Sequence, residues 1–528
     1  MKGKLSLVKA MVMIMKKSIL STVLMAAVLL SAQMAMTVSA AESADDLILI
    51  SPRPQTEQTG SDTQLILNSR YEQYAGMYSF DGVAEQLNSI EVLLGDGMNF
   101  NLDDLPDRQQ ASVMVVRMRG EEAEAIAAYE AGEITCPFSD VDNWAKPYVA
   151  WLYEKGITKG VGDNQFGNRD CTAEEYVTFM LRALGYTVTW SAEEGTDTLF
   201  ADVLDYASDL HLWDSLLASE PEFNRGVMSA VTYQTLAADV KGTETRLLSA
   251  LTENGAIDKE KAEPILALYD RIDAAAALEL ASLTAVGGGL KLTGQMVQDE
   301  YRVLSVTGLP EGDAEDASYS GLILDVGLDF TDGKSDFAVS GEMYVLASDM
   351  AVTVPMGMWM HDGTAYVELS DQKLKADAAN AGDLEMMTSV FGDLSMMHEA
   401  AGFQYYAVSD VVVEPMTEED ITGTVIIYDM TKFMWPIAAV QLDMEGFTTD
   451  ASLLTLVTTQ KYFNETGVLS AVFNSMYTRV SETDIQSNIT ANAELLLETT
   501  VTYTAWGDEV TLTFPDFSEF VEISEEEV

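Results

Sequence analysis

The sequence predicts a multidomain α+β protein, in which three helix-loop-helix repeats form one α-helical domain and a mainly antiparallel β domain with helices follows. Two observations predict it. Between residues 79 and 242, apolar residues recur three and four apart in short stretches separated by Gly-containing loops, which is typical of amphipathic helices. From residue 284 onward, polar and apolar residues alternate between Gly/Asp turns, which is typical of antiparallel strands.

Residues 1–40 are typical of a secretory signal peptide. Five lysines precede an apolar run over residues 19–30, and Val38-Ser39-Ala40 is a small-residue cleavage site. The run is too short for a membrane-spanning helix, and no later stretch reaches 18 consecutive apolar residues. No Cys lies near the cleavage site to accept a lipid. We therefore expect an exported chain, with residues 41–78, rich in Ser, Thr, Gln and Glu, as a linker.

The charge of the chain excludes one class of partner. The sequence has 29 Lys and Arg against 85 Asp and Glu, a net charge of −56, and loss of the signal lysines makes it more negative. Such a polyanion does not bind nucleic acid or an anionic membrane through a basic patch. We interpret the acidity as a solvated exterior, with a surface for divalent ions as the alternative. No Asp-rich loop with calcium-binding spacing is evident.

The best-defined repeat covers residues 136–188. Its first helix is predicted from apolar residues at helical spacing, Val141, Trp144, Tyr148 and Leu152. Asp140 or Asp142 is available to cap that helix. Thr172 and Glu175 form a capping box that begins a second helix. The repeat is therefore a helix, a Gly-rich loop and a second helix.

The order of signals in this repeat resembles the S-layer homology (SLH) module of bacterial cell-surface proteins. The family's Phe-x-Asp-Val, Trp-Ala, Lys-Gly-Ile/Leu, Gly-Asp-x-x-Phe and Thr-Arg-Ala-Glu signals correspond to residues 138–141, 144–145, 155–157, 162–166 and 172–175. One position departs from the pattern, because Ala173 stands where the family usually has Arg. The resemblance implies a cell-wall or cell-surface location and non-covalent binding to a secondary cell-wall polysaccharide.

Two weaker copies flank this repeat, over residues 79–122 and 197–242. Arg108 and Ala173 each lie twelve residues before a Gly, so the second helices of the first two copies are in register. Three copies at a spacing of roughly sixty residues form an internal repeat, and a single helix pair cannot bury its own apolar face. The SLH resemblance implies a compact, pseudo-threefold domain.

The resemblance also implies the binding residues. In the family, an Arg at the start of the second helix pairs with an acidic sugar substituent such as a pyruvate ketal, a contact that guanidinium geometry suits. Here only Arg108 and Arg225 occupy that position. Trp144 is able to stack on a sugar face. Its alternative role, as a core anchor of its helix, stays open.

The two cysteines, Cys136 and Cys171, each precede a helix of the middle repeat. In an exported chain we predict a disulfide between them, with two free thiols as the alternative. Two Cys without a neighbouring His do not predict a metal site.

The remaining chain is predicted to be a helical connector over residues 243–283 and a β-rich domain over residues 284–528. Strands are predicted over 290–296, 301–307, 319–330, 336–346, 356–360, 364–369, 406–413, 439–444, 453–462, 488–503 and 510–514, with a helix over 379–400. His361-Asp362-Gly363 indicates a tight hairpin between two of them.

Short motifs in the β-rich domain, at residues 362–366, 372–375, 502–503 and 510–515, resemble the LolA/LprG-like carriers. In that superfamily a curved antiparallel sheet wraps around helices and holds an acyl chain. The many methionines of this domain either line an adaptable apolar cavity or pack an ordinary core. The resemblance thus implies an alternative function, a wall-tethered carrier of a lipid or other apolar ligand.

Nothing in the sequence predicts catalysis or a cofactor. His211, His361 and His398 lack a metal-ligand or triad-like signature, and no nucleophile elbow or phosphate loop is present. We therefore expect no enzyme activity and no metal ligands. The predicted function is that of an acidic surface protein, anchored to the wall by SLH-like repeats and displaying a β-rich domain.

Overall fold

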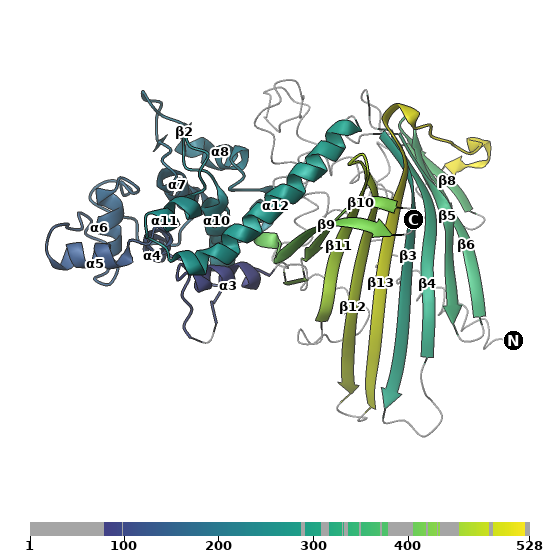
Figure 1. Cartoon of the computed structure of the whole chain (residues 1–528), viewed down its shortest axis with the longest axis horizontal. Coiled ribbons are helices and arrows are strands. Elements are labelled where there is room, and N and C mark those ends of the chain that lie inside the picture. The colour runs from purple at the N-terminus through teal and green to yellow at the C-terminus, as the bar shows by residue number, and fades with distance from the viewer. Residues whose placement is uncertain are drawn as a thin grey trace. The chain divides into compact units, whose positions relative to one another are not determined.

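The computed structural model describes residues 79–97, 99–286, 291–307, 316–329, 331, 336–347, 350–369, 372–377, 405–418, 421–429, 431–432, 454–484 and 489–522. The predicted signal peptide (1–40), linker (41–78), helix over 379–400 and strand over 439–444 lie outside these residues. The described chain divides into a helical unit, residues 79–273 with 405–410, and a sheet unit that holds the rest (Figure 1). The predicted α+β multidomain class is confirmed.

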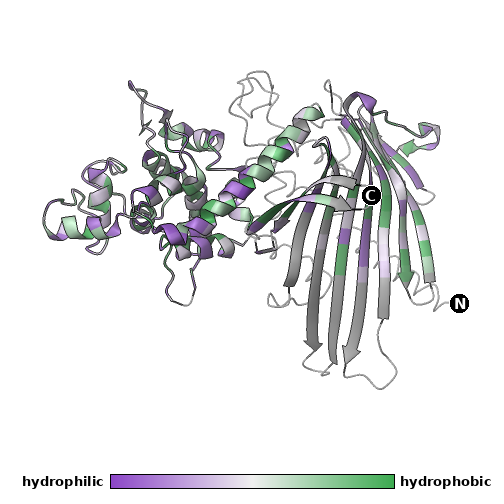
Figure 2. Ribbon diagram, in the orientation of Figure 1, coloured by the Kyte–Doolittle hydropathy of each residue, from purple (hydrophilic) through white to green (hydrophobic). Residues whose placement is uncertain are grey.

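The helical unit consists of short helices joined by loops. They are α3 (Asp81–Ser89), α4 (Arg108–Met118), α5 (Glu122–Glu130), α6 (Lys146–Glu154), α7 (Ala173–Ala183), α8 (Val203–Asp209), α9 (Ser215–Ser219), α10 (Arg225–Ala237), α11 (Leu247–Glu253) and the first part of α12 (Lys259–Ala285). A parallel pair, β1 (Val188–Thr189) and β2 (Thr198–Leu199), lies between α7 and α8. Each of these helices carries both hydrophobic and hydrophilic residues (Figure 2). No helix among the described residues is long and apolar enough to cross a bilayer.

The second helices of the three repeats, α4, α7 and α10, form the core of this unit and are buried along most of their length. Each begins after a capping side chain, Asp107, Thr172 or Asn224, which accepts a hydrogen bond from the backbone N–H three residues later. Hydroxyl groups inside them donate to the carbonyl four residues earlier, as Ser112, Thr178, Ser229, Thr232 and Thr235 do. These polar residues are therefore buried with their donors satisfied.

The first helix of the middle repeat begins later than the sequence predicts. α6 starts at Lys146, with Pro147 in its first turn and no side-chain cap. Pro is favoured at this position because its missing N–H has no partner in a first helical turn anyway. Asp140 and Asp142 make other contacts, so the prediction that one of them caps the helix was wrong. Trp144 precedes α6 and does not share its buried face.

The sheet unit contains the remaining strands. They are β3 (Lys291–Thr307), β4 (Asp316–Asp329), β5 (Asp336–Ala347), β6 (Met350–His361), β7 (Thr364–Leu369), β8 (Gln372–Asp377), β9 (Asp410–Glu418), β10 (Ile421–Asp429), β11 (Leu454–Asn464), β12 (Leu469–Asp484), β13 (Ile489–Trp506) and β14 (Val521–Glu522). Within the described residues they form one sheet, ordered β14-β8-β7-β6-β5-β4-β3-β13-β12-β11-β10-β9. β14 pairs in parallel with β8, whereas the neighbouring pairs from β8 to β10 are antiparallel.

One face of this sheet buries a methionine- and leucine-rich cluster. Its members come from β3, β4, β5, β6 and β13: Leu292, Met296, Leu322, Leu324, Leu328, Phe337, Val339, Met343, Met358 and Val501. Successive residues of a strand point to opposite faces, so the intervening residues lie on the other side.

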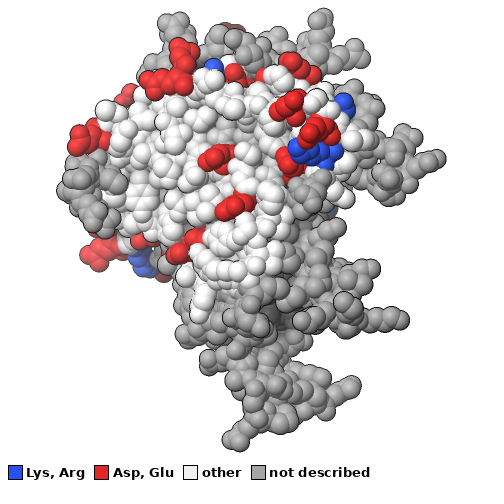
Figure 3. Space-filling model, turned by 90° about the vertical axis from the view of Figure 1, so that its right-hand side faces the viewer, with Lys and Arg blue, Asp and Glu red and all other residues white. Residues whose placement is uncertain are grey.

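Figure 3 draws one face of the molecule, on which acidic residues are scattered among uncharged ones.

The opposite face of β6 and β7 is covered by the C-terminal segment. Phe514 stacks on His361, and Phe517 stacks on Tyr366 at a ring-centroid distance of 3.6 Å. Phe520 packs edge-on against Trp359. The strand predicted over residues 510–514 was wrong, because these aromatic side chains lie across the face of the sheet instead of extending its ladder.

The last turns of α12 are fixed to the sheet by a buried ion pair. Glu279 accepts a 2.6 Å hydrogen bond from Lys461 of β11 and another from the hydroxyl of Tyr428 of β10. The two charged side chains are only 2% and 3% exposed. Burial raises the pKa of Glu279, although Lys461 and Tyr428 oppose the shift. Both side chains are almost fully removed from water, so the ion pair compensates part of the cost of burying the two charges.

We predict that Glu279→Ala destabilises the sheet unit by about 3–5 kcal/mol, because it removes the carboxylate that forms the 2.6 Å ion pair with the buried Lys461. Urea unfolding followed by circular dichroism measures the change. The double variant Glu279→Met/Lys461→Met should recover most of the loss, and Glu509→Ala, at an exposed acidic residue, is the control. A Glu279→Ala protein that unfolds at the parent's midpoint would contradict the prediction.

Candidate functional site

The three second helices begin close together because the loops that precede them are hydrogen-bonded to one another. Four backbone bonds join them: Arg108 N to Arg169 O (3.0 Å), Cys171 N to Pro106 O (2.9 Å), Arg225 N to Asp104 O (2.9 Å) and Gly226 N to Leu102 O (2.9 Å). The loop before α4 thus contacts the start of both α7 and α10. This arrangement brings the two arginines predicted from the sequence into one region of the helical unit.

Arg108 lies inside the interface between the first and second repeats. Its side chain is 5% exposed, and its Nη1 forms a 2.6 Å ion pair with Glu175 Oε1. The guanidinium lies 4.8 Å from the ring centroid of Phe166 and 5.4 Å from that of Phe179. Its position at the helix start is as predicted, but it faces the neighbouring repeat and not solvent. Arg108 therefore holds two repeats together in this structure.

Glu175 binds a second arginine that the sequence analysis missed. Arg169 donates from Nη1 to Oε2 (2.9 Å) and from Nη2 to Oε1 (2.7 Å), and its side chain is 53% exposed. Arg169 lies four residues before Ala173, where the family has Arg. The middle repeat therefore has a cation near the start of α7 despite the substitution. An Arg just before a capping box was the only sequence signal for it.

Arg225 is more accessible than Arg108. It is half-buried, and its Nε donates to the carbonyl of Phe100 (3.0 Å). No ion pair of Arg225 is found within the part of the chain that the structure describes. Burial lowers the pKa of Arg225, Arg117 adds to the shift and Asp104 opposes it, and the group stays charged at neutral pH. Arg225 thus remains a candidate for an anionic ligand.

Trp144 is 50% exposed. Its alternative role as a core anchor was therefore wrong. Among the described residues, no hydrogen bond or cation–π contact joins Trp144 to Arg108 or Arg225, so the structure shows no such link between Trp144 and the two predicted arginines.

The contacts of Asp140 show what the Asp of the Phe-x-Asp-Val signal does in the middle repeat. Its carboxylate accepts hydrogen bonds from the backbone N–H groups of Phe166 (2.7 Å), Gly167 (2.8 Å) and Asn168 (3.2 Å). Burial alone would raise the pKa of Asp140, but these donors outweigh it and lower the pKa. Gly160 has φ +69°, and a Cβ there would lie 2.4 Å from the ring of Phe138. The Asp and the Gly therefore shape the loop.

Cys136 and Cys171 are free thiols in this structure, which differs from the predicted disulfide. Each Sγ lies against a nearby carbonyl, at 3.8 Å from Phe138 O and 3.6 Å from Thr172 O. Cys171 is buried, whereas Cys136 is partly exposed. Burial raises the pKa of both thiols, and more strongly that of Cys171.

Comparison with known proteins identifies the middle repeat. Residues 137–167 match the S-layer homology domain, which confirms the SLH module predicted there. No curated protein matches this sequence. Among solved structures, LprF from Mycobacterium bovis aligns with 46% of this chain and 97% of its own length, at 13% identity and a TM-score of 0.22.

The reactivity of Cys136 and Cys171 distinguishes the free thiols of the structure from the disulfide predicted from the sequence. In folded protein without reductant, we expect iodoacetamide to label Cys136 at least roughly tenfold faster than Cys171, because access and a lower thiol pKa favour it. Peptide mass spectrometry over a time course measures both rates. After unfolding in urea both should label fully. Failure of both to label in urea would establish the disulfide instead.

Proposed function

We propose that the helical unit attaches the exported chain non-covalently to a cell-wall polysaccharide and so holds the sheet unit at the cell surface. The observation that carries this proposal is the SLH match over residues 137–167. It is supported by the arrangement around the match, in which three capped helices begin next to one another.

The ligand chemistry that fits this unit is a sugar polymer with sparse acidic substituents, such as pyruvate ketals. A chain with a net charge of −56 repels polyanions, so an anionic group must find a local cation. Arg225 begins α10, where free N–H groups and the helix dipole already favour an anion. Trp144 offers an exposed indole for a sugar ring. In this proposal Arg108 acts indirectly, by positioning the first and second repeats.

We predict that Arg225→Ala weakens binding to purified cell-wall sacculi roughly ten- to a hundredfold, because a charge-assisted pair contributes about 1.5–3 kcal/mol. Trp144→Ala should also weaken binding to sacculi, and the double variant should bind more weakly than either single variant. Co-sedimentation with sacculi, before and after extraction of the polysaccharide, measures both effects. Circular dichroism confirms that each variant is folded.

Two matched controls separate a site from general charge or stickiness. Lys261→Ala removes a cation from α12 that pairs with Glu91, and Trp190→Ala removes an indole that is 74% exposed outside the matched segment. Both should bind sacculi like the parent. If folded Arg225→Ala/Trp144→Ala also sediments like the parent, the proposed contacts are wrong. If the protein binds equally well to sacculi before and after the polysaccharide has been extracted, the polysaccharide is not the ligand.

The second candidate function is a wall-tethered carrier of an amphiphile in the sheet unit. Two hydroxyl groups on its methionine-rich face favour it, because Thr499 Oγ1 and the Tyr503 hydroxyl are buried and have no hydrogen-bond partner among the described residues. A buried hydroxyl without a partner is costly, and the polar end of a bound amphiphile would satisfy it.

For this carrier we predict saturable binding of a fluorescent fatty acid to the mature chain. Tyr503→Phe keeps the ring but removes the hydroxyl, so affinity should fall roughly fivefold, about 1 kcal/mol. Tyr319→Phe is the control, since its hydroxyl lies on the other face and bonds to Asp299. Fluorescence titration measures the affinities. Lack of saturation, or equal effects of the two variants, would exclude this site.

A further inference from the structure

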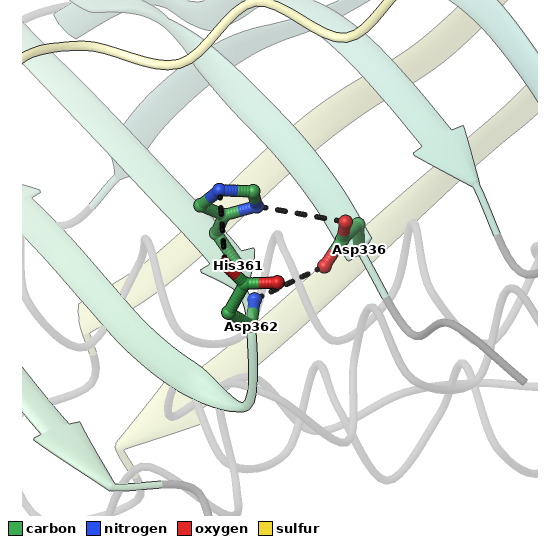
Figure 4. Close-up of side chains that lie close together, drawn as sticks. All are labelled: Asp336, His361 and Asp362. Carbon is green, nitrogen blue, oxygen red and sulfur yellow. Dashed lines mark hydrogen bonds and ion pairs between the residues drawn. The ribbon is translucent and has the colours of Figure 1, made fainter.

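Asp336, His361 and Asp362 form a compact group of mixed donors on the sheet unit, apart from the face discussed for the carrier. β5 and β6 pair so that Phe337 faces Met360, which places Asp336 opposite His361. Asp362 follows in the turn to β7, with φ +50°. Figure 4 shows the three side chains close to one another. Two residues adjacent in sequence thus meet a third from the start of another strand.

The donor atoms of this group already lie near one another. His361 Nδ1 is 3.5 Å from Asp336 Oδ2, and His361 Nε2 is 3.6 Å from Asp362 Oδ2. One donor atom from each residue can be chosen so that all three lie within 4.8 Å of each other. Around a tetrahedral Zn²⁺, with bonds of 2.0–2.2 Å, donor atoms lie about 3.3 Å apart. One ring nitrogen of His361 binds an ion, so the carboxylate that now faces the other nitrogen must turn toward it, and the spacing of the three donors must shorten from at most 4.8 Å to about 3.3 Å.

Three features prepare the group for a cation. The imidazole is stacked on Phe514, with ring centroids 4.3 Å apart, so its plane is fixed. His361 Nδ1 is buried and makes no hydrogen bond within the described part of the chain. The backbone N–H of Asp362 donates to Asp336 Oδ1 (3.2 Å), which joins the turn to the start of β5. Hydrogen bonds within the group do not satisfy the imidazole, whereas a metal ion would.

We propose that Asp336, His361 and Asp362 bind a divalent transition-metal ion, with Zn²⁺ as the best fit. An imidazole nitrogen with two carboxylates suits Zn²⁺ better than Ca²⁺ or Mg²⁺, which prefer all-oxygen ligand sets. Three protein ligands leave a fourth position for water, and the Asp362 side chain is 89% exposed. The bound ion would connect the start of β5, the β6–β7 turn and, through the stacked imidazole, the C-terminal segment. This site is independent of the proposed wall attachment.

The test compares Zn²⁺ binding by the metal-free mature chain and its variants, measured by competition with a coloured chelator. We expect one site of micromolar affinity above the weak background of the acidic surface. His361→Phe keeps a ring for stacking on Phe514 but removes both nitrogens, and Asp362→Asn keeps a side chain that tolerates positive φ. Each should weaken this site roughly ten- to a hundredfold. Asp325→Asn removes an exposed carboxylate elsewhere on the sheet and should leave it unchanged.

A second measurement uses the unmodified protein, so it does not require that a variant folds. Zn²⁺ should protect His361 from diethyl pyrocarbonate and leave the reactivity of His211, in the helical unit, unchanged, as mapped by mass spectrometry. Unaltered Zn²⁺ stoichiometry and affinity in folded His361→Phe would overturn the site. Zn²⁺ that fails to protect His361 would overturn it as well, and would leave the group as a histidine packed beside two carboxylates.

Discussion

The carboxylate of Glu175 is the contact on which the helical unit depends. It completes the capping box of α7, binds Arg169 with both oxygens and pairs with the buried Arg108 of the preceding repeat. Each short helix supplies little apolar surface for packing. The ion pairs and hydrogen bonds at the helix starts therefore help to fix the positions of the helices relative to one another. A buried guanidinium is tolerated there because a carboxylate neutralises it and two aromatic rings cover it. The Arg of the motif thus stabilises the interface between repeats.

The described part of the sheet unit also contains a buried ion pair, whereas the register of its strands positions most of its other side chains. Glu279 fixes α12 to β10 and β11 as a buried charge with two partners. Elsewhere the antiparallel ladder decides which side chains meet, since a shift of one residue would exchange the two faces of every strand. It places the methionines on one face and the aromatic contacts of Phe514, Phe517 and Phe520 on the other.

The sequence predicted whatever is encoded locally. The capping box of Thr172, the starts of α4 and α10, and the hairpin at Asp362 follow from residues a few positions apart. β3 was predicted as two strands, and β8, β10 and β12 were not predicted, because their alternation is weak or interrupted by polar residues. Contacts set by tertiary pairing could not be predicted. Asp336 lies 25 residues before His361 and meets it only through the register of β5 and β6, and the burial of Arg108 depends on a neighbouring repeat.

The repeats also explain why the best match to the SLH pattern tolerates Ala173. Arg108 of the first repeat contacts Phe166 of the second, and Arg225 of the third contacts Phe100 of the first. α7 of the second repeat in turn contacts the third repeat. There, the buried Tyr176 bonds to Thr232 through its hydroxyl (2.6 Å) and packs its ring against Phe223. A tyrosine contact thus occupies the interface where the other two repeats use arginine. Of the two helix-start arginines, only Arg225 keeps a guanidinium without a described carboxylate partner, and for this reason the proposed wall contact uses Arg225 and not Arg108.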